Sequence, residues 1–87
     1  MEHNDSFHSA AAPATSELAF SLVDAMQGKP EGYQFAAVSL LFLLMCRRFG
    51  ANPGDVLSST GRRMEDALSI GRGEHIRAIK NYLREEL

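Results

Sequence analysis

The sequence contains one cysteine, three prolines and no tryptophan in 87 residues. A chain with a single cysteine, Cys46, cannot form an internal disulfide, which excludes the disulfide-stapled class of small secreted domains. A chain of this length forms one domain and buries a smaller share of its surface than a larger protein does. We therefore expect one domain with a thin stability margin, and the cytoplasm as its natural compartment.

Positive charge is scarce in the first half of the chain. Up to Cys46 the only Lys or Arg is Lys29, and the whole chain carries nine basic against eleven acidic residues, a formal net charge of -2. This balance argues against binding nucleic acid through bulk charge. No Lys or Arg precedes the first apolar stretch, so we expect no secretory signal, which would begin with a positively charged region.

No apolar run is long enough to cross a membrane. The longest, Phe35 to Cys46, is interrupted only by Ser39 and spans 12 residues. A membrane-spanning helix needs roughly 20 apolar residues. The run predicts a buried core helix, and we expect no membrane partner.

Hydrophobic residues make up 45% of the chain, and they recur mostly at helical rather than strand spacing. Thr15 and Ser16 are N-cap types before the first such pattern, and Gly28 followed by Pro30 ends it. The sequence predicts helices at about residues 15–27, 32–49, 53–69 and 74–87.

These patterns predict an all-α fold, a small bundle of about four helices around a central apolar helix. The central helix is residues 32–49, because it is apolar on every side and must be covered by its neighbours or by another chain. Residues 1–14 show no sustained period and are predicted to be a flexible N-terminal tail. Residues 15–87 are predicted to form the single helical domain.

The sharpest local signal lies between the second and third predicted helices. Gly50 is placed to end one helix, while Asn52 and Pro53 are placed as the N-cap and first residue of the next. Gly61 then falls inside a helix, where it costs roughly 1 kcal/mol relative to alanine. We expect it to allow a close crossing with helix 32–49.

No catalytic constellation is visible. The apolar run around Cys46 predicts that this cysteine is buried, and no histidine lies near it at helical spacing. The hydroxyls of Ser58 and Ser59 have no evident general base. Carboxylates fall on predicted exposed faces, where such groups usually solvate the surface. We expect the protein not to be an enzyme.

The three histidines do not form a ligand cluster. His3 and His8 fall in the predicted tail, and His75 stands alone at the start of the last helix. A structural zinc site needs four ligands at close spacing. We therefore expect no metal site and no cofactor.

The segment Met45 to Arg63 permits a second interpretation, a dimeric helix-turn-helix regulator that reads DNA with helix 53–69. Cys46, Gly50 and Val56 occupy compatible positions. Three acidic residues argue against this interpretation, because they would place negative charge beside the phosphates of DNA: Asp55, Glu65 and Asp66. The candidate DNA-binding residues are Ser58, Ser59, Arg62 and Arg63.

The leading functional hypothesis is a non-enzymatic protein that docks a helical surface onto a partner protein, as an accessory inhibitor or adaptor of bacterial or phage type. Arginine and tyrosine are enriched at interface hot spots. The candidate partner-binding residues are Arg62, Arg63, Arg77, Tyr82 and Arg84.

Self-association is the remaining expectation from the sequence. Helix 74–87 carries a narrow apolar stripe that can pack inside the domain or pair with its copy, and we favour a homodimer. A structural subunit that assembles into a larger particle is a further alternative. The stripe consists of Ile76, Ile79, Leu83 and Leu87.

Overall fold

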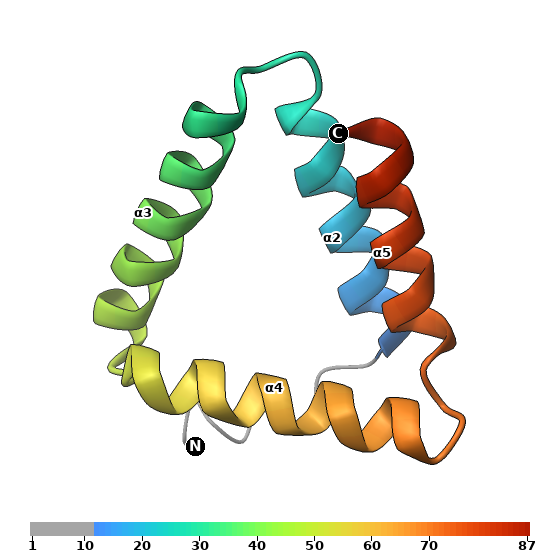
Figure 1. Cartoon of the computed structure of the whole chain (residues 1–87). Coiled ribbons are helices and arrows are strands. Elements are labelled where there is room, and N and C mark those ends of the chain that lie inside the picture. The colour runs from blue at the N-terminus through green and yellow to red at the C-terminus, as the bar shows by residue number, and fades with distance from the viewer. Residues whose placement is uncertain (1–11) are drawn as a thin grey trace.

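A computed structural model describes residues 12–87 of the chain as helices joined by short turns. This confirms the predicted all-α class, and residues 12–87 contain four helices, as predicted, and no strand. Most of the predicted tail, including His3 and His8, lies outside the described residues. The helices are α2 (Ala12–Met26), α3 (Glu31–Phe49), α4 (Pro53–Ser69) and α5 (Glu74–Glu86) (Figure 1).

Helix α2 begins earlier than its sequence pattern predicts. It starts at Ala12, so residues 12–14 are helical although they were assigned to the tail. Pro13 is its second residue, where the fixed φ of proline suits a helix and its missing N–H is not needed. The helix ends before Gly28, whose φ of 76° is accessible to glycine at little cost.

The corner between α3 and α4 confirms the predicted capping residues. Gly50 adopts the left-handed conformation, with φ 70°, and its N–H donates to the carbonyl oxygen of Cys46. The Oδ1 atom of Asn52 accepts a hydrogen bond from the N–H of Asp55 at 3.0 Å. The chain turns by 110° between the two helices. Because α3 ends at Gly50 and α4 is capped two residues later by Asn52, the two helices diverge at this steep angle.

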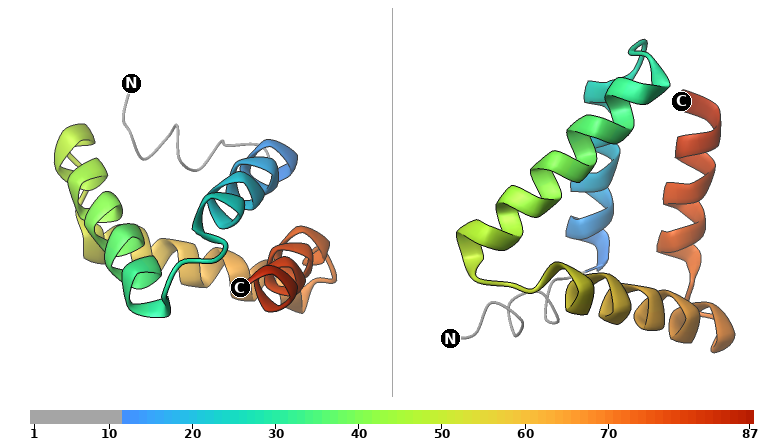
Figure 2. Two further views of the ribbon diagram at one scale, coloured as in Figure 1. Left: turned by 90° about the horizontal axis from the view of Figure 1, so that it is seen from above. Right: turned by 60° about the vertical axis from the view of Figure 1, so that its left-hand side comes forward.

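The helices form an open triangular frame (Figures 1 and 2). Helices α3 and α4 are two of its sides, and α2 and α5 run parallel, side by side, along the third. The ring of Phe20 lies 4.8 Å from that of Tyr82, centroid to centroid, and the Tyr82 hydroxyl donates to Asp24. The side-chain amide of Gln27 donates to Glu86. These contacts join the first and last described helices.

Little of the chain is buried. Among the described hydrophobic residues, only Val23 and Cys46 are buried, whereas 17 large hydrophobic side chains are at least 40% exposed. Helix α3 forms one side of the frame, and the other helices of the same chain do not enclose it (Figure 2). A Cβ added at Gly61 would meet nothing within 4 Å, so the expected close crossing with α3 is not formed. The 110° turn holds the two helices apart.

Candidate partner-binding surface

Helix α3 presents the largest exposed apolar surface of the described chain. Its leucines, alanines and methionine are strong helix formers, so the segment is helical although little of it is covered. No charged residue lies between Glu31 and Arg47. Eight large apolar side chains are 44–73% exposed: Tyr33, Phe35, Val38, Leu40, Leu41, Leu43, Leu44 and Met45.

The two sides of α3 differ in exposure. Successive helical residues are rotated by about 100°, which places half-buried Phe42 and buried Cys46 on one side. The opposite side is exposed along its length. We call this side the α3 free face, and it consists of Tyr33, Ala36, Ala37, Leu40 and Leu44.

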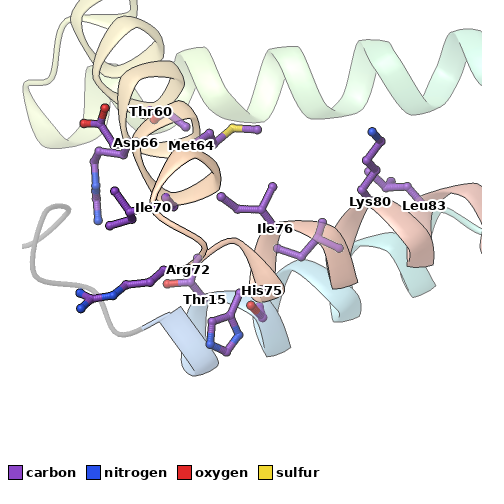
Figure 3. A pocket seen from close by; sticks show the side chains of 14 residues that line it. Thr15, Thr60, Met64, Asp66, Ile70, Arg72, His75, Ile76, Lys80 and Leu83 are labelled. Atoms are coloured by element: carbon purple, nitrogen blue, oxygen red, sulfur yellow. The ribbon is translucent and has the colours of Figure 1, made fainter.

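A second apolar surface is a groove where α4, α5 and the start of α2 meet, with a volume of about 800 Å³ (Figure 3). Helix α4 contributes Met64 to its wall, and α5 contributes most of the apolar stripe predicted from the sequence. The stripe residues in the wall are Ile76, Ile79 and Leu83. The stripe therefore faces an open groove rather than a filled core.

The predicted arginines are spread over two helices. Arg62 is exposed on α4, on the side opposite Met64, whereas Arg63 lines the groove. Arg77 and Arg84 are exposed on α5, and the Nη2 atom of Arg84 donates to Asn81 Oδ1 at 3.2 Å. Only Arg63 among the four lies in the groove wall.

Tyr82 is engaged within the chain. It was expected to face a partner, but it lies between α5 and α2, half-buried, with its ring against Phe20. Its hydroxyl donates to Asp24, and this hydrogen bond raises the pKa of Tyr82 to about 12. Desolvation and the negative charges of Asp24 and Glu86 raise this pKa further in the same direction.

The candidate DNA-binding residues share α4 with acidic side chains. Ser58 and Arg62 are exposed and Ser59 is half-buried. At helical spacing, Asp55 and Glu65 fall on the same outward side as Arg62. This side therefore carries more negative than positive charge.

The structure shows no metal-binding group of three His, Cys, Asp or Glu side chains within residues 12–87. His75, half-buried, lines the groove (Figure 3). Within the same residues, no helix alone has the length and apolarity to cross a membrane, although the bent pair α3–α4 meets that test jointly.

The exposed surface of α3 is not among the predicted partner-binding residues. The sequence predicts that this helix is covered by its neighbours or by another chain, and within residues 12–87 the neighbours leave it exposed. The signal was the absence of any charge from Gly32 to Cys46, because a helix with one solvated face normally carries polar residues there. No protein family model, curated protein or solved structure matches this chain.

Proposed function

We propose that the protein is a non-enzymatic helical binding protein that completes its hydrophobic core on another polypeptide chain, through α3. The observation that carries this proposal is the exposure of eight large apolar side chains on the uncharged stretch of one helix, between Glu31 and Arg47. Burying the exposed half of such side chains is worth on the order of 10 kcal/mol in total. That is comparable to the whole stability of a typical domain, about 5–15 kcal/mol.

A bound partner would meet an apolar centre with a charged edge. Interfaces commonly have such an apolar core and a polar rim. Arg47 and Arg48 follow the uncharged stretch of α3 directly, and the guanidinium of Arg48 lies 5.2 Å from the ring centroid of Phe49. Once α3 is covered, the remaining helical surface would let the protein act as an inhibitor or adaptor.

A photo-crosslinking amino acid placed at Leu40, in cells that naturally make the protein, tests this proposal. Leu40 is 61% exposed on α3, and Ser58, exposed on the outward side of α4, is the matched control position. We expect the probe at Leu40 to capture a polypeptide, because that side chain lies inside the proposed interface. The probe at Ser58 should capture little protein.

The outcomes separate the candidate functions. A protein adduct from Leu40 supports docking through α3, whatever the partner is. Equal labelling from both positions, or no protein adduct from Leu40, would show that α3 does not dock and would refute the proposal.

A second candidate function is DNA binding by α3 and α4 as a helix-turn-helix. Helices in this motif cross at about 90–120° through a short turn that often contains glycine. The chain turns by 110° here, and the turn contains Gly50. The excess of negative charge beside Arg62 opposes the assignment.

Binding of the purified protein to random duplex DNA at low salt tests the second candidate. DNA binding predicts a complex that Arg62→Ala weakens, with an affinity that falls steeply as salt is added. Absence of any complex at low salt would eliminate the helix-turn-helix function. It would leave docking through α3 untouched.

A further inference from the structure

The α3 free face matches a second copy of itself in size. The free face and the flanking Leu41 and Leu43 offer on the order of 600 Å² of exposed surface, because other exposed side chains such as Phe35 point to the opposite side of the helix. Each partner in a specific, stable interface contributes about 600–1,000 Å². Two copies paired through the α3 free face would therefore bury the area of a small stable interface.

Charge along α3 also suits a second copy, in one orientation. The helix has Glu31 at its start and Arg47 and Arg48 at its end, with no charge between them. An antiparallel copy keeps the arginine pairs of the two chains at opposite ends of the interface, and it opposes the two helix dipoles. A parallel copy would instead gather four arginines at one end.

The uncharged centre of the face favours a second copy over a partner of complementary charge. Charged groups across an interface select and steer specific partners. The α3 free face offers no charge for such recognition over the stretch from Gly32 to Cys46. Its apolar residues need only an equally uncharged surface, which each copy supplies to the other.

We propose that the partner of the α3 free face is the same face of a second copy, packed antiparallel about a two-fold axis near Leu40. This inference rests on the proposed function and names its partner. The uncharged stretch from Gly32 to Cys46 is centred on Ser39, and Leu40 is the adjacent residue on the free face. A two-fold axis makes such an interface self-complementary.

The axis near Leu40 fixes which residues face each other. In an antiparallel pair centred there, Ala36 lies opposite Leu44 of the second copy, so the large leucine side chain packs over the small alanine. Tyr33 lies opposite Arg47 of the second copy, a pairing in which guanidinium and aromatic ring attract. Helix α3 then becomes the centre of the dimer.

Cysteine crosslinking tests the pairing directly. The variants are Leu40→Cys, Ala36→Cys and Leu44→Cys, each made with Cys46→Ala and treated with a short bis-maleimide. We expect Leu40→Cys to crosslink to itself. Ala36→Cys and Leu44→Cys should each crosslink poorly alone and efficiently when the two proteins are mixed, because they face each other across the axis.

Sedimentation equilibrium supplies the companion measurement. The unmodified chain is expected to sediment at twice its mass of 9.6 kDa. Leu40→Glu should weaken the dimer by about 100-fold or more, because it buries two uncompensated charges at the axis. Ser58→Glu adds the same charge on the outward side of α4 and should leave the dimer intact.

Each alternative result overturns the inference. A mass of 9.6 kDa at every concentration removes the second copy, and efficient self-crosslinking by Ala36→Cys, Leu40→Cys and Leu44→Cys alike indicates a parallel pair. A dimer that Leu40→Glu leaves unchanged uses another surface. Capture of a different protein at Leu40 in cells, combined with a monomeric purified chain, would retain the proposed function and discard this partner.

Discussion

At the scale of single residues, Tyr82 is the side chain that ties α5 to α2. Its ring packs on Phe20 at 4.8 Å, and its hydroxyl donates to Asp24. The hydrogen bond requires the protonated phenol, which is why the pKa of Tyr82 rises to about 12 from an ordinary value of 10.0. The contact is therefore sensitive to alkaline pH.

The frame is expected to lose stability as the pH rises from about 10 to about 12. In this window the phenol of the unfolded chain is ionised while the folded state still holds its proton, so unfolding releases a proton and becomes more favourable. Thermal unfolding followed across this range checks the prediction. Asp24→Asn should flatten the pH dependence, and an unchanged slope would show that the hydrogen bond does not control the Tyr82 proton.

At the scale of the helix, the α3–α4 corner is set by its capping residues. Gly50 ends α3 in a left-handed conformation, and Asn52 starts α4 with a side-chain hydrogen bond to the N–H of Asp55. These two residues fix the direction in which α4 leaves α3. The geometry of this turn therefore keeps α3 apart from the other helices.

Replacing Asn52 with alanine should lower the free energy of unfolding by about 1 kcal/mol, because the cap of α4 is lost. Urea denaturation monitored by circular dichroism measures the change. Ser58→Ala, on the exposed outward side of the same helix, is the matched control and should change stability much less. Equal effects would mean that Asn52 does not act as a cap.

Gly61→Ala should raise the free energy of unfolding by about 1 kcal/mol, since alanine favours a helix interior. The added Cβ meets nothing within 4 Å in the single chain. The same denaturation experiment checks this. A loss of stability would reveal that another chain packs closely against Gly61.

Local signals predict the helices and the all-α class, whereas the direction of each helix depends on the turns between them. The helix start at Asn52 and the helix end at Gly50 follow from single residue types, so the sequence predicted them directly. The direction of α3 depends on a turn of 110°, which no periodicity encodes. For the same reason no periodicity encodes the contact of Tyr82 with Phe20 on a distant helix.

At the scale of the whole molecule, residues 12–87 leave most of their own large apolar side chains exposed. A stable domain packs at least two layers of secondary structure around a core. Here only Val23 and Cys46 are buried among the hydrophobic residues of the described chain. The proposed function supplies the second layer over α3 from another polypeptide.

The proposed dimer predicts that the melting temperature of the purified protein depends on its concentration. When folding and association are coupled, a tenfold rise in concentration should raise Tm by about 3–5 °C for a dimer of this size. Differential scanning calorimetry over a wide concentration range measures it. Leu40→Glu should melt lower and without this dependence, whereas an unmodified chain with a constant Tm would contradict coupled association.

The pairing of α2 with α5 also has a consequence for the speed of folding. Asp24 and Tyr82 are 58 residues apart, and Gln27 and Glu86 are 59 apart. Helical proteins fold fast when their contacts are local, but this one must close a long loop before its frame is complete. On the ribosome, α2 is therefore synthesised before α5 is available to pair with it, and during that interval the nascent chain is most prone to aggregate.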